Sequence, residues 1–377
     1  MRIVHVTGYF VINMAYQENL LPVGQFELGH DVFILTGRNE PDFGFNRETR
    51  RDLATHFNYK GVNVIRLDDY FEITNKGPIL RGLLLQLYKL RPDILFIHDV
   101  GTSFLAGLLY KLLNPQVRLQ VDCHSTPANA RNSKIGPLYH GIFKILFQLF
   151  RSKFDRIFAI APETIDFMHR YYGLGESEIT LLPLPGDPSL LFQREEIRAR
   201  IRQELNIHDE MKIIIHTGKL PGDKETETVL KAFSIIKDAN IRLLIAGSIE
   251  EGFKPIFEKY LENDSRIVYV GWVNAGRLRE LFLSCDLLVQ PGSLSNTFID
   301  AICCGLPILL DDTPQGRYLT SFGNGSVICR GDVIQLADAV QNCLLHSKHP
   351  TLKKNSELAS DHFGYLHNAK ITLDHLS

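Results

Sequence analysis

Several features are scarce in this 377-residue sequence, and each scarcity excludes a class of protein. The 41 Lys and Arg nearly balance the 43 Asp and Glu, so we expect no nucleic-acid partner. No stretch reaches the roughly 18 uncharged apolar residues of a membrane span. The N-terminus, MRIVHVT, lacks the features of a signal peptide. We therefore expect a cytoplasmic protein, with peripheral contact at the inner face of a membrane as the remaining membrane option.

Cofactor and metal motifs are also missing. The six cysteines lack C-x-x-C spacing and lie partly in apolar segments, so we expect buried, reduced thiols. No G-x-G-x-x-G follows the first strand, which argues against a nicotinamide dehydrogenase. No D-x-D lies near a predicted strand end, and Asp311-Asp312 is the nearest acidic pair. We expect neither a cofactor nor a metal ion.

Short apolar runs alternate with helical patterns along the whole chain, which is typical of βαβ units and parallel sheets. The strands predicted in the first half are 3–7, 31–36, 62–66, 93–98, 117–122 and 156–161. Those predicted in the second half are 213–216, 242–246, 267–270, 287–290 and 308–310. The predicted fold class is α/β, with two Rossmann-like doubly wound domains that face each other across a cleft.

The alternation breaks once, near the middle of the chain. Residues 182–188, LPLPGDP, carry three prolines and a glycine, which indicates a linker. A chain of this length is also typical of two domains. We predict an N-terminal domain over 1–185, a C-terminal domain over 186–350, and a closing helix over 351–377 that crosses back to the N-terminal domain.

The stretch over 213–228, IIIHTGKLPGDKETET, predicts a strand, a glycine loop with Gly218 and Gly222, and a helix capped by Asp223. Lys219 and Lys224 are expected in the loop. In parallel α/β sheets, ligands bind beyond the carboxyl ends of the strands, and a helix N-terminus favours an anion. Two lysines there favour a diphosphate ligand, and a solvated loop with two surface lysines is the alternative.

Four motifs of the second half resemble those of the retaining glycosyltransferases of family 4, which have the GT-B fold. They are TGKLPGDK (217–224), LLIAGS (243–248), VYVGWV (268–273) and PGSLSNTFIDAICCGLP (291–307). The first half is similar to sugar transferases of bacterial surface-polysaccharide assembly at 5–10, 16–19 and 123–132. The resemblance implies transfer of a hexose-type sugar from a UDP- or GDP-linked donor to a saccharide or lipid-linked acceptor. It also implies retention of configuration, in polysaccharide or other glycan biosynthesis.

The resemblance also implies a donor site. Lys219 and Lys224 would stabilise the leaving diphosphate without a metal ion. Asp300 would accept the ribose hydroxyls, although it could instead only complement a helix dipole. Further donor contacts would come from Gly218, Gly247, Trp272, Val273, Ser293, Ser295 and Asn296. A packed tryptophan is the alternative at Trp272.

In the first half, His124 follows a predicted strand, and the resemblance makes it a catalytic residue that donates to a sugar hydroxyl or to the reacting oxygen. A structural histidine at the mouth of a sheet is the alternative, and His98 is a weaker candidate. Acceptor-side candidates, with helix solvation as the alternative for the first two, are Glu18, Asn19, Arg131 and Asn132. A basic apolar helix over 134–153 is expected to belong to the core, with a membrane-surface helix as the alternative.

One departure from the family keeps other functions open. Gly292 stands where the family has the first of two glutamates, and Asp300 replaces the second. A non-catalytic binding homologue with a decayed donor site is therefore one alternative. A nucleotide-sugar epimerase or a phosphorylase on the same fold is another, because fold alone does not decide function.

Overall fold

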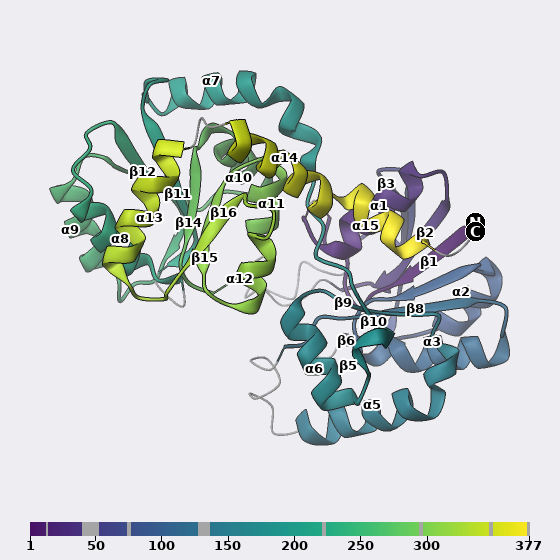
Figure 1. Cartoon of the computed structure of the whole chain (residues 1–377). Coiled ribbons are helices and arrows are strands. Elements are labelled where there is room, and N and C mark those ends of the chain that lie inside the picture. The colour runs from purple at the N-terminus through teal and green to yellow at the C-terminus, as the bar shows by residue number, and fades with distance from the viewer. Residues whose placement is uncertain are drawn as a thin grey trace. The chain divides into compact units, whose positions relative to one another are not determined.

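The structure is a computed structural model that describes residues 1–12, 14–39, 53–73, 77–126, 136–220, 224–293, 297–346 and 350–374. The chain divides into two compact units, Met1–Pro185 with Tyr365–Ser377 (unit 1) and Gly186–Gly364 (unit 2). Each unit is a mainly parallel sheet covered by helices (Figure 1). The predicted α/β class with two Rossmann-like domains is confirmed. Among the described helices, none is long and apolar enough to cross a bilayer.

Unit 1 contains an eight-stranded sheet of order β10-β9-β8-β7-β1-β2-β4-β3, in which only β3 runs antiparallel to its neighbour. Its strands are β1 (Arg2–Val6), β2 (Asp31–Gly37), β3 (His56–Tyr59), β4 (Val62–Leu67), β7 (Ile94–Ile97), β8 (Arg118–Cys123), β9 (Arg156–Ala159) and β10 (Ile179–Leu181). A separate hairpin is formed by β5 (Asp69–Ile73) and β6 (Gly77–Leu80). The central strand β7 is apolar and buried at every residue, because helices bury both faces of a parallel sheet.

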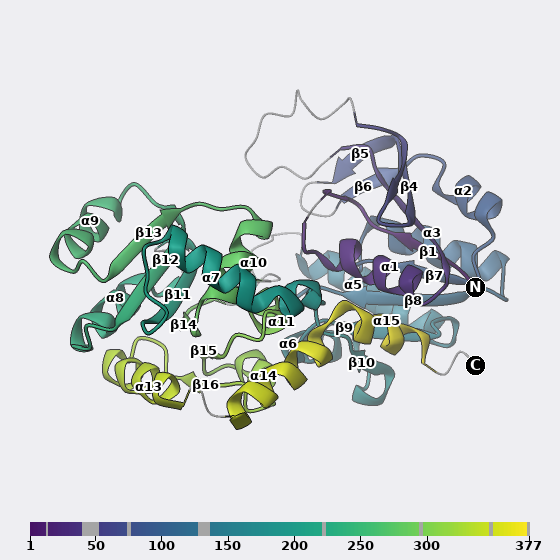
Figure 2. The same ribbon diagram turned by 90° about the horizontal axis from the view of Figure 1, so that it is seen from above.

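Helices cover both faces of this sheet. On one face lie α2 (Leu83–Leu90), α3 (Thr102–Leu113) and α5 (Gly136–Phe150), and Phe104 of α3 packs edge-on against Phe143 of α5. The other face carries α1 (Gln17–Glu27) and α15 (Tyr365–Leu373), as Figures 1 and 2 show. A Cβ at Gly24 would lie 2.8 Å from the Tyr365 carbonyl oxygen, so glycine lets these two helices approach. The unit also contains α6 (Pro162–Tyr172).

Unit 2 contains a six-stranded parallel sheet of order β13-β12-β11-β14-β15-β16. The strands are β11 (Lys212–Leu220), β12 (Ile241–Ile249), β13 (Ile267–Gly271), β14 (Leu287–Gln290), β15 (Ile308–Asp311) and β16 (Gly325–Ile328). The helices are α7 (Arg194–Glu204), α8 (Thr226–Ile235), α9 (Lys254–Asn263), α10 (Ala275–Ser284), α11 (Thr297–Cys303), α12 (Pro314–Leu319), α13 (Val333–His346) and α14 (Pro350–Phe363). One core joins α8, α9 and α13 to the sheet through Phe233, Phe257 and Val340.

The C-terminal segment differs from the prediction. In place of one helix over 351–377, the structure has α14 in unit 2 and α15 in unit 1, with Gly364 between them. The α14 hydroxyl of Ser360 donates to the carbonyl of Cys303 in α11 at 3.0 Å. The cysteines also differ in part, because Cys329 is exposed rather than buried.

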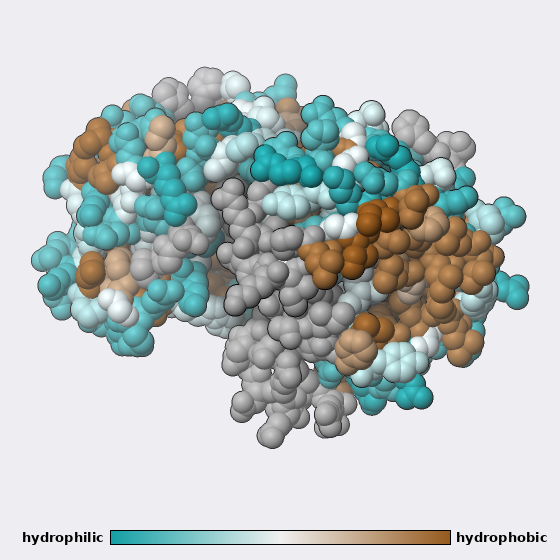
Figure 3. Space-filling view, turned by 90° about the horizontal axis from the view of Figure 1, so that it is seen from below, coloured by the Kyte–Doolittle hydropathy of each residue, from teal (hydrophilic) through white to brown (hydrophobic). Residues whose placement is uncertain are grey.

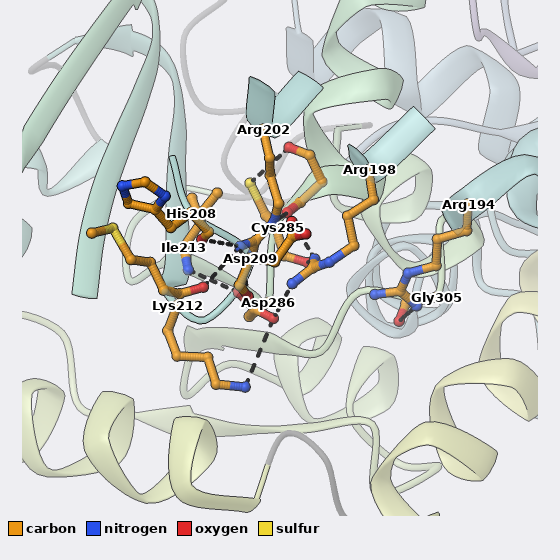
Figure 4. A network of polar contacts seen from close by, with 12 residues as sticks. Arg194, Arg198, Arg202, His208, Asp209, Lys212, Ile213, Cys285, Asp286 and Gly305 are labelled. Atoms are coloured by element: carbon orange, nitrogen blue, oxygen red, sulfur yellow. Dashed lines mark hydrogen bonds and ion pairs between the residues drawn. The ribbon is translucent and has the colours of Figure 1, made fainter. Parts of the chain in front are cut away.

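The charged helix α7 carries a buried cation. Arg202 is 1% exposed, and its guanidinium donates to Asp286 at 2.9 Å and to the carbonyl of Ser284 at 3.1 Å (Figure 4). Asp286 also accepts from Arg198 and from the backbone N–H of Ile213 at 2.8 Å. The carboxylate therefore fastens α7 to the first residues of β11, and its charge balances a cation that water does not reach.

We expect the Asp286→Ala variant to lose about 3 kcal/mol or more of unfolding free energy, because it leaves Arg202 buried without a counter-charge. Chemical denaturation measures this loss. The control is Glu227→Ala, which removes the exposed pair with Lys231 and should cost less than about 1 kcal/mol. Equal losses in the two variants would contradict the structural role of Asp286.

Candidate active site

The central strand of unit 2 is longer than predicted. β11 continues through Lys219 to Leu220, so the prediction that Lys219 lies in a loop is wrong. The extension is paired residue by residue with β12, Gly218 opposite Gly247 and Lys219 opposite Ser248. The Lys219 side chain is 77% exposed and lies 3.9 Å from Glu250. The expected cap Asp223 lies outside the described residues, and α8 begins at Thr226 with Glu225 as its N-cap.

Two glycines make the end of this strand pair unusually close. Gly218 has φ +133° and Gly247 has φ +154°, values that side-chain-bearing residues rarely adopt. A Cβ at Gly247 would lie 1.8 Å from the Gly218 carbonyl oxygen. The glycines therefore leave bare backbone at the carboxyl end of the sheet, where ligands of parallel α/β proteins approach.

Lys224 lies over this bare backbone. Its ammonium group donates to the carbonyl of Ser293 at 2.7 Å and lies 5.7 Å from the ring centre of Phe298. Its methylene stem passes beside Gly218, since a Cβ there would lie 3.1 Å from the lysine Cε. The contacts hold one positive charge at the carboxyl ends of β11 and β14, next to the start of α8.

Two supporting residues were not predicted. His216 is fully buried and bridges the Val289 carbonyl at 2.8 Å and the Thr226 hydroxyl at 3.0 Å, which ties β11 to β14 and α8. Burial lowers the pKa of His216 to about 4, so the ring is neutral at pH 7. Gln290 uses its amide to bond both backbone groups of Thr217. The signal available in sequence was a polar residue inside each of two buried strands.

Asp300 lies in the first turn of α11 and is 5% exposed. Burial, together with the charge of Asp187, raises the pKa of Asp300 to about 7, although Arg279 opposes the shift. Arg279 is itself held by Asp187 at 2.9 Å. No described residue donates a hydrogen bond to the Asp300 carboxylate, so the group is suited to accept from a ligand hydroxyl.

The other predicted donor contacts are placed as follows. Trp272 and Val273 follow β13, as predicted, and the tryptophan is 74% exposed rather than packed. The Ser293 carbonyl accepts a hydrogen bond from Lys224. Gly292, at the position of the family glutamate, is buried. Ser295 and Asn296 lie outside the described residues.

In unit 1, His124 directly follows β8 and its ring lies 3.3 Å from the Asp122 carboxylate. Burial alone would lower the pKa of His124, but the charges of Asp122, Asp99 and Glu18 outweigh it and raise the pKa to about 9. Burial alone would raise the pKa of Asp122, but His124 and His98 hold it well below its ordinary value. The ring is therefore an imidazolium at pH 7, and no described residue accepts from its second nitrogen.

A buried chain of polar side chains holds the Asp122 carboxylate. His98 donates to its second oxygen at 3.2 Å, and the other nitrogen of His98 lies 3.0 Å from His5. His5 in turn lies 2.6 Å from the Gln25 carbonyl oxygen, and Gln25 donates to the Thr372 hydroxyl at 2.9 Å. Burial and the neighbouring His98 lower the pKa of His5 to about 3, so His5 is neutral.

The backbone around Asp122 is also constrained. Asp99 adopts φ +65° at the end of β7 and donates its N–H to Asp122 at 2.6 Å. The Asp99 carboxylate accepts from the N–H of His124 at 3.2 Å. Such a strained residue persists where its surroundings hold it, and it is common at functional sites.

The acceptor-side candidates differ in their surroundings. Glu18 lies in the first turn of α1, and burial raises its pKa even though His98 and His124 oppose the shift. Asn19 is fully buried; its amide nitrogen donates to the Val11 carbonyl at 2.9 Å, and no described residue donates to its amide oxygen. Arg131 and Asn132 lie outside the described residues.

Within the described part of the chain, one cluster has ligand atoms close enough for a metal ion. The atoms of His98, Asp122 and His124 lie within 4.8 Å of one another. Both carboxylate oxygens already accept from His98 and from the Asp99 N–H, and His124 is cationic. In this protonation state the cluster is an ion-pair network, and a metal ion would bind His124 only after displacing its proton.

Two family models match this chain, one over the first half and one over the second. A family model described as Glycosyltransferase Family 4 matches residues 24–190, and one described as Glycosyl transferases group 1 matches residues 197–358. An uncharacterized glycosyltransferase of Methanocaldococcus jannaschii is 28% identical over 321 residues, which are 77% of this chain and 74% of that protein.

Solved structures agree with this match. A glycosyltransferase of Rickettsia africae superposes with a TM-score of 0.71 at 14% identity, over 99% of this chain and 97% of that one. HepE of Anabaena, in complex with UDP and glucose, gives a TM-score of 0.66 at 13% identity, over 99% and 98%. Together these matches define a glycosyltransferase of the GT-B fold. This chain is one, with a family 4 domain followed by a group 1 domain.

Proposed function

We propose that the protein transfers a sugar from a nucleoside diphosphate donor, UDP- or GDP-linked, to a saccharide or lipid-linked acceptor. The observation that carries the proposal is the end of β11, where the methylene stem of Lys224 passes beside Gly218 and its ammonium group donates to the Ser293 carbonyl. A fixed cation at the carboxyl end of a parallel sheet fits a leaving diphosphate. That HepE binds UDP on the same fold supports this assignment.

We propose the other donor contacts as follows. The Asp300 carboxylate, which accepts no hydrogen bond from a described residue, would accept from the ribose hydroxyls. Trp272 and Val273 would contact the base, and Gly218, Gly247 and Ser293 would offer backbone to the phosphates. Further donor contacts are proposed from Lys219, Ser295 and Asn296. No metal ion is needed where lysine neutralises the diphosphate.

On the unit 1 side, we assign His124 as the catalytic residue that donates to a sugar hydroxyl or to the reacting oxygen. The acceptor is proposed to lie near Glu18, with Arg131 and Asn132 as further candidates. Retention of configuration is proposed from the resemblance to family 4. A role in polysaccharide or other glycan assembly, at the cytoplasmic face of a membrane, would suit a lipid-linked acceptor.

One feature favours a second candidate function, a non-catalytic binding homologue. Gly292 offers no side chain where the family has a glutamate, so one contact to the donor sugar is lost. The two functions differ in turnover. Release of UDP or GDP from its sugar, even by slow hydrolysis, supports the enzyme, whereas donor binding without release supports the binding homologue.

The proposal is tested by thermal unfolding with UDP, GDP, ADP and CDP, for the wild type and the Lys224→Ala variant. A ligand at about 100 times its dissociation constant adds roughly 2.7 kcal/mol to the stability of the folded state. We expect a rise in Tm with one base and its loss in the variant. No rise with any nucleotide would reject the donor site.

Donor binding should depend on pH through Asp300. Its pKa of about 7 means that the carboxylate needed to accept ribose hydroxyls forms only as pH rises through 7. We expect the affinity for the nucleoside diphosphate to increase between about pH 6 and pH 8 in calorimetric titrations. The Asp300→Asn variant should bind about tenfold more weakly at pH 8 and lose this part of the pH dependence.

The same variant is the control, because the ionisation of the diphosphate itself contributes equally in both proteins. Without ligand, the free energy of unfolding of the wild type should decrease as pH rises, opposite to the trend in affinity. A raised pKa gives the folded state an advantage that is complete below about pH 4 and is lost as pH rises through 7. Identical pH profiles for the two proteins would rule out Asp300 as the ribose ligand.

A further inference from the structure

Unit 1 carries an apolar surface on the outer side of α2, α3 and α5. Helices that cover a sheet usually bury one apolar face and expose a polar one. The inner face of these helices is buried, because Phe143 and Phe147 of α5 pack on Phe104 of α3. The outer face is apolar as well, and Figure 3 shows it as a continuous brown area.

The exposed residues follow helical spacing. Leu138, Ile142, Ile145 and Leu149 recur along α5, and their exposed fractions are 68%, 49%, 57% and 70%. The neighbouring helices continue this surface with Leu105, Leu109, Leu112 and Leu113 of α3 and with Leu85 and Tyr88 of α2. Contact between the helices is direct, since the Tyr88 ring packs edge-on against Tyr110. Contiguous patches of this kind mark an interaction site.

The charged residues within these three helices have one sign. The sequences of α2, α3 and α5 contain no aspartate or glutamate. The exposed cations Lys89 and Lys144 lie on α2 and α5, and Lys153 follows α5 closely. A second copy of this chain docked on the same face would bring these lysines together, because a two-fold interface pairs a patch with itself. An anionic partner would instead be attracted.

We infer that this surface binds a bilayer that contains anionic lipids. The leucine and isoleucine side chains would enter the acyl boundary, Tyr88 would lie at the interface, and the lysines would meet the headgroups. The protein would thus be peripheral, held by one face of unit 1. Bilayer binding does not depend on the proposed function. A role of this surface in presenting a lipid-linked acceptor to the enzyme does rest on the proposed function.

Vesicle flotation tests the inference with the full-length protein. We expect the wild type to float with vesicles of phosphatidylcholine containing about a third phosphatidylglycerol, and less at high salt or with phosphatidylcholine alone. The Leu109→Asp/Ile145→Asp double variant should lower the bound fraction by about tenfold or more. Both positions are exposed, so the variant should keep its Tm.

The control is Ile334→Asp in unit 2, where the native side chain is 61% exposed. It places the same charge on an apolar surface residue away from the patch and should float like the wild type. The inference fails if the wild type does not float, or if the double variant floats equally well. It also fails if ultracentrifugation shows a dimer that the double variant abolishes while vesicles bind neither protein. Nucleotide-dependent Tm shifts are measured separately, so they report on the donor site alone.

Discussion

Replacing Lys224 with alanine is expected to slow sugar transfer by about 100- to 1000-fold, the usual effect of removing a group that stabilises charge in the transition state. Negative charge grows on the diphosphate as the glycosidic bond breaks. The Lys224 ammonium is already placed for this charge, because the Ser293 carbonyl at 2.7 Å and the Phe298 ring fix it. Little reorganisation is then needed during the reaction.

Lys219 should matter much less. Its side chain is 77% exposed, and its nearest acidic partner, Glu250, is 3.9 Å away, so water screens its charge. We expect Lys219→Ala to lower the rate by about tenfold or less. Steady-state kinetics with the donor identified by Tm shifts would separate the two lysines.

The matched control is Lys231→Ala, which removes an exposed lysine that pairs with Glu227 on α8. It should leave the rate unchanged. If Lys224→Ala raises KM and leaves kcat intact, the lysine binds the ground state equally well and does not act in the transition state. An unaltered kcat/KM would remove Lys224 from the mechanism.

The fold was predictable because its determinants are local. Apolar strands of four to six residues alternate with helical periodicity, and this pattern alone indicates two doubly wound sheets. The region around 217–224 was predictable as a candidate site because glycine and lysine follow a buried strand. Its geometry was not, since the pairing of Gly218 with Gly247 extends β11 through Lys219. Strand register depends on partners that the local sequence does not reveal.

The site in unit 1 was predictable only in part. His124 and His98 could be singled out because each lies at the end of a predicted strand, whereas Asp122, which pairs with both, and His5, which contacts His98, were not identified. Their contacts arise because β1, β7 and β8 lie side by side. The apolar outer face of α5 was predicted to belong to the core, with a membrane surface as the alternative, for a different reason. A helix that is apolar all round is expected in a core.

The pH dependence of the reaction should identify the protonated His124 as the active form. In the wild type, activity should decline as the pH rises through about 9, where the imidazolium loses its proton. The Asp122→Asn variant removes the largest opposite charge, so the decline should occur near pH 6.5 or below, at the ordinary histidine pKa or beneath it. At pH 7 the rate should fall by about fourfold or more, because at most about a quarter of the imidazole keeps its proton when its pKa is 6.5 or lower.

Unfolding measurements check the same assignment without substrate. Because the pKa of His124 is raised on folding, its pairing stabilises the wild type fully below about pH 6.5, and this contribution is lost as pH rises through 9. Asp122→Asn should lack that slope, whereas the control Asp166→Asn, an exposed change on α6, should retain it. A variant that unfolds and reacts with the pH profile of the wild type would show that Asp122 does not hold the charge on His124. If only the slope of stability disappears, the network supports the fold, and the proton donor must be sought elsewhere.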